Sequence, residues 1–141
     1  MMIGNHVTKT WPSTQKSITL SPAEAELVAA VKMSTELIGA TQMAEDWGIH
    51  LHGRVHVDSS AAIAIAERKG NGKLRHVRVG NLWIQEKVEK EELQIQKVAG
   101  EWNPADALTK GLSQEKMARF LRITSQKFED GRAERSLKLK E

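Results

Sequence analysis

The sequence predicts an α/β fold in which parallel strands are flanked by helices. Short β-branched runs at residues 54–58 and 93–98 are separated by longer segments with helical spacing of apolar residues. Strands that alternate with helices are typical of an α/β sheet. Each run is followed by a helix start with an early carboxylate, Asp58 in one case and Asp106 in the other. We therefore expect the two strands to lie side by side in parallel, with both carboxylates at the same end.

The composition is that of one globular domain of 141 residues, with 40% hydrophobic and 28% charged residues. The chain contains no cysteine, which excludes disulfides, zinc–thiolate sites and thiol catalysis. It has no apolar run long enough for a membrane span and no signal peptide, so we expect an intracellular protein, cytoplasmic or nuclear, that is not secreted. The net charge of +3 permits a polyanionic partner without requiring one.

The N-terminal part predicts one strand and one long helix. Residues 6–11 alternate in polarity and predict a strand that a proline ends. The run Ser-Pro-Ala-Glu at residues 21–24 predicts the start of a helix. Ser21 is a good N-cap, the proline stands at the first helical position, and Glu24 completes a capping box. Apolar spacing continues the helix to about Trp47, and Gly48 is expected to end it.

The middle of the chain predicts two helices around a break. After the strand at residues 54–58, an alanine-rich helix is expected to reach about Lys69, and the Gly-Asn-Gly run at 70–72 stops it. Residues 73–91 have the apolar spacing of a longer helix. Glu86 and Lys90 form a favourable i,i+4 pair on its exposed side, in support of that prediction.

The C-terminal part predicts two more helices and a tail. Asn103 is the expected N-cap of a helix that contains Asp106. A last helix is expected at residues 115–123, followed by a charged and disordered tail at 124–141, so that residues 1–123 form the domain. The apolar side chains that this last helix is expected to bury are Met117, Phe120 and Leu121.

Three carboxylates are candidates for a common site, because they belong to separate segments that the α/β arrangement can bring to one end of the sheet. These are Glu26, Asp58 and Asp106. Clustered carboxylates repel one another, and a hard cation such as Mg²⁺ relieves that repulsion. Simpler interpretations stay open: Glu26 as a solvated helix residue, Asp58 as an N-cap, and Asp106 as a favourable charge near a helix N-terminus.

Four motifs resemble the ribonuclease H domain at the end of copia-type retrotransposon polyproteins. They occur in the family's order, and together they cover about residues 5–112. The resemblance implies a ribonuclease H-like mixed sheet with flanking helices that lacks the first strands of the family. The motifs are SITLSPAEAELVAA at 17–30, VDSSAAIA at 57–64, RHVRV at 75–79 leading into IQEKV at 84–88, and NPADALTK at 103–110.

The resemblance implies cleavage of RNA in RNA–DNA hybrids with two Mg²⁺ ions held by four carboxylates. By position, Glu26 resembles the family's glutamate, Asp58 its second aspartate and Asp106 its last, each catalytic and metal-binding. The first aspartate has no counterpart, since residues 1–23 contain neither Asp nor Glu and Asp46 has the wrong setting. We therefore expect a polyprotein fragment that is inactive by itself and needs an upstream segment, such as the reverse transcriptase portion.

Basic and aromatic residues are candidates for contacts with the hybrid. Lysine and arginine side chains on one segment can face phosphates, although a solvated charged surface explains them equally well. An aromatic ring before the last carboxylate can stack on a base, although packing in a loop is the simpler interpretation. These candidates are Lys69, Lys73, Arg75, Arg78 and Trp102.

Two functions remain open from the sequence. The first is a Mg²⁺-dependent ribonuclease H domain of retrotransposon origin. The second is a non-catalytic module of the same fold that binds nucleic acid or associates with the reverse transcriptase. The missing fourth carboxylate distinguishes them, because two-metal hydrolysis depends on it whereas binding does not.

Overall fold

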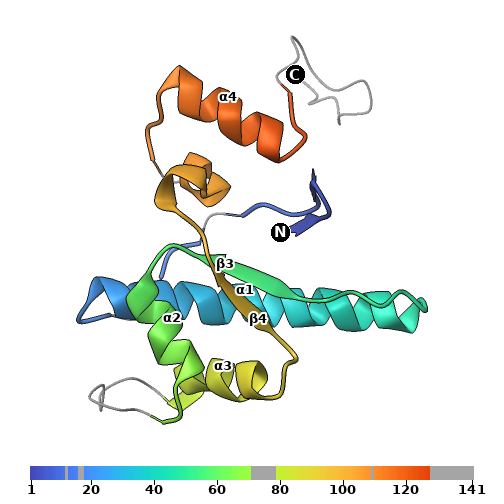
Figure 1. Ribbon diagram of the computed structural model, residues 1–141, viewed down its shortest axis with the longest axis vertical. Coiled ribbons are helices and arrows are strands. Elements are labelled where there is room, and N and C mark those ends of the chain that lie inside the picture. The colour runs from blue at the N-terminus through green and yellow to red at the C-terminus, as the bar shows by residue number, and fades with distance from the viewer. Residues whose placement is uncertain (12, 16–17, 71–78, 109, 128–141) are drawn as a thin grey trace, which may run out of the picture.

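The computed structural model describes residues 1–11, 13–15, 18–70, 79–108 and 110–127 (Figure 1). In this part of the chain, helices alternate with strands, as the sequence predicts. No described helix is both long and apolar enough to cross a membrane. The main elements are α1 (Pro22–Asp46), β3 (Arg54–Val57), α2 (Ser60–Glu67), α3 (Val79–Glu89), β4 (Gln94–Lys97) and α4 (Gln114–Ile123).

Strands β3 and β4 form a parallel pair, which confirms the expected arrangement of the two predicted strands. Val55 lies opposite Ile95 and Val57 opposite Lys97 in the register. Along β3, exposed and buried residues alternate, so one face of the pair is covered and the other is open. Because the strands are parallel, both carboxyl ends lie at the same edge.

Helices α1 and α2 cover the buried face of the strand pair, and α3 packs against both helices. Figure 1 shows α1 running along this layer, with the carboxyl ends of β3 and β4 near its N-terminal part. The side chains between helices and strands form one continuous hydrophobic cluster that fixes their relative positions. Its buried members are Leu27, Ala30, Val55, Val57, Ala62, Ile65, Ala66, Ile84 and Leu93.

Helix α1 begins and ends as the sequence predicts. The Ser21 hydroxyl accepts a hydrogen bond from the Glu24 N–H at 3.2 Å. The Glu24 carboxylate in turn accepts from the N–H of Leu20 at 2.6 Å, one residue before the N–H that a standard capping box would use. At the other end Gly48 has a φ of +75°, the left-handed conformation that glycine adopts most easily after a helix. Glu24 is therefore a capping residue.

Helix α2 is capped by Ser59, not by the aspartate before it. The Ser59 hydroxyl accepts a hydrogen bond from the Ala62 N–H at 3.2 Å. The sequence analysis left an N-cap role for Asp58 open. Because Ser59 satisfies the helix end, the side chain of Asp58 at the carboxyl end of β3 is free to interact elsewhere.

The strand predicted at residues 6–11 is shorter than expected. Only β2 (His6–Val7) is a strand, and it pairs with β1 (Met2–Ile3) in antiparallel orientation. The N–H groups of Thr8 and Lys9 both donate to the Met1 carbonyl, so the chain closes on its own N-terminus rather than continuing a ladder. Among the described residues there are two separate two-stranded sheets in place of the single mixed sheet that the resemblance implied.

The segment after Asn103 forms a 3₁₀ turn instead of the predicted α-helix. Two 3₁₀ turns, η1 (Gly100–Trp102) and η2 (Pro104–Leu108), occupy this region. The Asn103 side chain accepts a hydrogen bond from the Ala105 N–H at 3.2 Å, which confirms its capping role. A segment this short closes i→i+3 bonds more readily than a full α-helix.

The predictions for α3 and the C-terminus lie partly outside the described residues. Helix α3 is described from Val79, and residues 73–78 of the predicted helix fall outside, as do residues 128–141 of the predicted tail. In α4, Phe120 is buried as expected, whereas Met117 and Leu121 are half-buried. Helix α4 therefore packs mainly through one side chain and lies away from α1–α3 (Figure 1).

Candidate acidic site

The three candidate carboxylates approach one another at the carboxyl end of the β3–β4 pair. Glu26 lies in the second turn of α1, Asp58 directly follows β3, and Asp106 lies in η2 beyond the end of β4. All three are partly buried. The convergence follows from the parallel pairing, since it places the residues after β3 and β4 at one edge, where the start of α1 also lies.

The pKa of Glu26 records this proximity. Burial raises the pKa of the Glu26 carboxyl above its ordinary value, a hydrogen bond with the Asp58 side chain raises it further, and the negative charges of Asp58 and Asp106 add to the increase. A hydrogen bond between two carboxyl groups requires one proton between them. Glu26 therefore releases its proton less readily than a solvated glutamate does.

A lysine partly offsets this repulsion. The ammonium group of Lys110 lies 2.8 Å from Oδ1 of Asp106, and its charge lowers the pKa of Glu26 against the other influences. The hydrogen bond with Asp106 raises the pKa of Lys110 above its ordinary value, as do the charges of Asp106, Asp58 and Glu26. Lys110 therefore belongs to the site electrostatically, although the sequence analysis did not select it.

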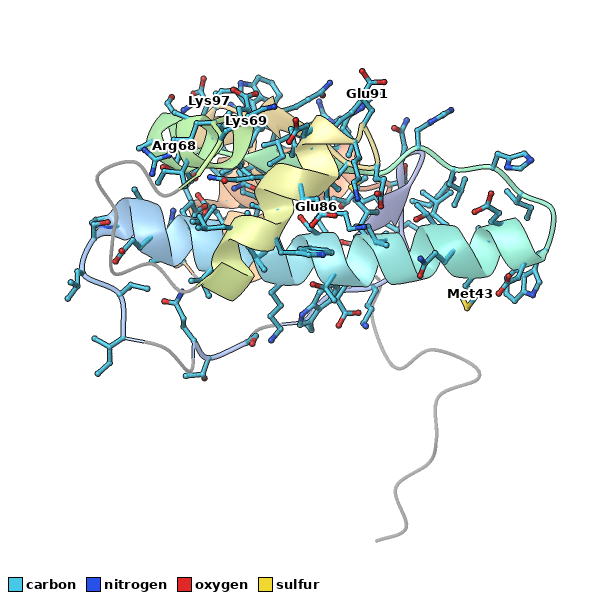
Figure 2. All side chains as sticks on the ribbon, turned by 90° about the horizontal axis from the view of Figure 1, so that it is seen from below. Met43, Arg68, Lys69, Glu86, Glu91 and Lys97 are labelled. Carbon is cyan, nitrogen blue, oxygen red and sulfur yellow. The ribbon has the colours of Figure 1, made fainter. Side chains whose placement is uncertain are left out.

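Two contacts from β4 and the segment after it hold Asp58 in place. Lys97, from the last position of β4, donates to the Asp58 carbonyl oxygen and, at 2.6 Å, to the Ser60 hydroxyl. Lys97 lies beside α2 in Figure 2, as these hydrogen bonds require. Gly100 lies over the Asp58 carboxylate, and a Cβ added there would be 3.7 Å from Oδ2. The chain after β4 thus packs directly against this side chain.

The chemistry of these residues fits a hard divalent cation. They supply carboxylate oxygens, which Mg²⁺ prefers, and their mutual repulsion raises the pKa of Glu26. In the described part of the chain, however, no group of three or more His, Asp or Glu side chains is arranged to hold an ion as it stands. The structure therefore brings the candidate ligands together in an arrangement in which the Lys110 ammonium group offsets part of their charge.

The described candidates for nucleic-acid contacts do not form a cluster like that of the three carboxylates. The ammonium of Lys69 is paired with the Glu89 carboxylate. The face of the Trp102 ring is covered by the Arg119 guanidinium of α4, 4.7 Å from the ring centroid, and the residue is 48% exposed. Lys73, Arg75 and Arg78 lie outside the described residues. Contacts of these five residues with nucleic acid stay a prediction.

Sequence reasoning missed several residues around the site. Lys110 had a detectable signal, since it follows Asp106 by four residues, the spacing of an ion pair on a helical turn. Lys97, Gly100 and Arg119 had none, because their partners are distant in the sequence. Only the packing of β4, η1 and α4 shows what these residues contact.

Comparison with known proteins gives one relevant similarity. The chain is 35% identical over 98 residues to the retrovirus-related Pol polyprotein from transposon TNT 1-94 of Nicotiana tabacum. The aligned region is 68% of this chain but only 7% of that polyprotein, so the chain spans a small part of its relative. No protein-family profile and no solved structure matches the chain. The chain therefore has a distant and partial similarity to a copia-type retrotransposon Pol polyprotein.

Proposed function

We propose that this chain carries part of a Mg²⁺-dependent ribonuclease H site of retrotransposon origin, which acts on the RNA strand of RNA–DNA hybrids. The observation that carries the proposal is the convergence of Glu26, Asp58 and Asp106 from three separate segments. The similarity to a retrotransposon Pol polyprotein supports the same origin. Neither a capping role nor simple solvation explains why the charges of Asp58 and Asp106 raise the pKa of the Glu26 carboxyl.

Each carboxylate has a distinct part in this proposal. Glu26 and Asp58 would both bind the cation as ionised carboxylates, and Asp106 would bind it from the η2 side. Magnesium would supply an activated water and stabilise the leaving oxygen. Lys97 would keep Asp58 in position through the Asp58 carbonyl oxygen. Gly100 would leave space beside the Asp58 carboxylate that a larger residue would reduce.

Cation binding is the first test. Isothermal titration calorimetry with MgCl₂ should detect binding to the 141-residue chain, and Asp58→Asn should weaken it at least tenfold, because a charged ligand is lost. Asp46→Asn is the matched control, since Asp46 is an exposed aspartate at the end of α1, outside the cluster. Equal Mg²⁺ affinity in wild type and Asp58→Asn would remove the proposed cation site.

Cleavage of a labelled RNA–DNA hybrid is the second test. Only three of the four carboxylates that the resemblance implies have counterparts, so we expect this chain to cleave barely above background in Mg²⁺. Losing a single transition-state contact in other enzymes costs on the order of 10²–10³ in rate. A version extended upstream by a strand that carries the missing aspartate should cleave in a Mg²⁺-dependent manner, and Asp58→Asn should abolish that activity.

A non-catalytic hybrid-binding module is the second candidate, favoured by the three-carboxylate count. It predicts binding that weakens with salt, according to the number of phosphates neutralised, and no cleavage by either version. Replacement of Lys73 and Arg75 by alanine should make the salt dependence shallower. Binding that does not change with salt would exclude contacts between these residues and phosphate groups.

A further inference from the structure

The ion pair of Lys110 differs from an ordinary pair of the same spacing. Lys110 and Asp106 are four residues apart, as are Lys90, directly after α3, and Glu86 on α3, and both lysines are similarly exposed, at 58% and 57%. The acidic partners differ: the Glu86 side chain is 56% exposed, whereas that of Asp106 is 18% exposed. Lys90 therefore pairs with a solvated carboxylate, and Lys110 with one that is largely removed from solvent.

Lys110 also acts on more than its immediate partner. Its positive charge influences Glu26, and the charges of both Asp58 and Glu26 influence Lys110. The other nearby ammonium group, that of Lys97, is engaged by the Asp58 carbonyl oxygen and the Ser60 hydroxyl instead. Through its contact with Asp106, the ammonium group of Lys110 offsets part of the negative charge of the three carboxylates.

We propose that Lys110 is the built-in counter-ion of the acidic cluster, which holds the cluster together without a metal and must withdraw from Asp106 when a divalent cation binds. This inference rests on the proposed cation site. A lysine suits the role, since its ammonium is a compact, strongly hydrated charge on a flexible stem and makes a single-point contact rather than the bidentate fork of arginine. Its large exposed fraction leaves the side chain a path into solvent.

The inference has two measurable consequences. Without metal, Lys110 stabilises the folded chain because it offsets repulsion among the carboxylates. With metal, Lys110 opposes binding, because its ammonium competes for an Asp106 oxygen and repels the incoming cation. Removal of the charge should therefore weaken the metal-free fold and tighten cation binding at the same time. Replacement of a lysine that only packs at the surface would not lower the stability of the metal-free fold and raise the cation affinity together.

The test compares Lys110→Gln with Lys90→Gln, the matched control from the solvated pair at the end of α3, whose acidic partner Glu86 is labelled in Figure 2. Calorimetric titration with MgCl₂ should give about five- to tenfold tighter binding for Lys110→Gln than for wild type, the size expected for charges a few ångströms apart. Lys90→Gln should bind as wild type does. Lys110→Arg retains the charge and should not tighten binding. If Lys110→Gln binds Mg²⁺ with unchanged affinity, the proposed competition between the Lys110 ammonium and the cation is wrong.

A double-mutant cycle tests the counter-ion role independently of any metal. Urea unfolding of the single and double variants of Lys110→Gln and Glu26→Gln in EDTA should show a coupling of at least about twofold in the unfolding equilibrium constant. Zero coupling would overturn the counter-ion role whatever Mg²⁺ does. Conversely, clear coupling together with no Mg²⁺ binding by any variant would contradict the proposed function and the displacement step, while Lys110 would remain the counter-ion of the acidic cluster.

Discussion

The two ends of the β3–β4 pair are built in different ways. At the amino end, Gly53 packs against Leu37 of α1, and Leu93 is almost completely buried. Lys87 and Glu92, which lie shortly before β4 in the chain, pair with each other at 2.6 Å. At the carboxyl end, three partly buried carboxylates lie close enough to raise the pKa of Glu26, and one lysine, Lys110, pairs with Asp106.

Residues at the amino end of the pair therefore stabilise the fold, whereas the carboxylates at the carboxyl end lower its stability through mutual repulsion. The amino end satisfies packing and pairs its charges, and so contributes to stability. The carboxyl end concentrates like charges, which is unfavourable in the absence of a cation. Ligands bind at the carboxyl ends of strands in open α/β sheets, so this is the end where function is expected.

The largest contrast is expected between two glycines, one at each end. A Cβ at Gly53 would be 3.2 Å from Cδ2 of Leu37, a side chain held against the core, so Gly53→Ala should cost about 1–3 kcal/mol through overpacking. Gly100→Ala would meet only an ordinary contact with Asp58 and should leave the free energy of unfolding nearly unchanged. Urea denaturation of both variants measures this, and equal losses would contradict the comparison.

The next effect separates capping from the acidic site at the β3–α2 junction. Ser59→Ala should cost about 1 kcal/mol, because the Ala62 N–H loses its partner at the start of α2. Asp58→Asn should cost less, since it removes a repelling charge beside Glu26 without removing the cap. If Asp58→Asn destabilises the metal-free chain as much as Ser59→Ala does, Asp58 is a structural residue and the distinction is wrong.

A smaller effect concerns the pH dependence of stability. Because the folded chain raises the pKa of Glu26, this group stabilises the fold fully below its unfolded pKa, and the contribution is lost as the pH rises through the raised value. Glu26→Gln should therefore gain a few tenths of a kcal/mol at neutral pH, after allowance for solvent screening, and nothing in acid. Thermal unfolding in EDTA from pH 3 to pH 8 provides the measurement.

Glu36→Gln, on the same helix, is the control for this pH series. Hydrogen bonding to Lys9 lowers the pKa of Glu36, so the ionised form stabilises the fold, and its contribution is lost as the pH falls. The control should therefore lower stability at neutral pH, opposite to Glu26→Gln. The same sign in both variants would mean that Glu26 is not under electrostatic strain.

The smallest effect is expected at the amino end. Glu92→Gln removes the partner of Lys87, but Glu92 is 41% exposed, and solvated ion pairs contribute little. The loss should be at most about 0.5 kcal/mol, and 0.5 M NaCl should reduce it further. A loss above 1 kcal/mol that persists in salt would show that charges at this end also carry structural weight.

The sequence by itself determined the elements whose signals are local. Ser21 and Glu24 specify the start of α1, Gly48 specifies its end, and polarity alternation specifies β3 and β4, because caps and periodicity depend only on neighbouring residues. It also identified three acidic residues that do converge. The predictions of a strand at residues 6–11 and of a helix after Asn103 were wrong. In both segments the hydrogen-bond partners of the backbone groups decide between a strand, a loop and a 3₁₀ turn.

Only the tertiary structure decided how the carboxylates interact. The raised pKa of Glu26 beside Asp58, the Lys110–Asp106 pair and the contact of Gly100 with Asp58 all depend on distances between segments of the fold. Pairwise electrostatic energies change steeply with distance and burial, and no local pattern encodes either quantity. Residue types can therefore suggest a site in the sequence, but its charge balance is set by the parallel packing of β3 and β4 beside α1.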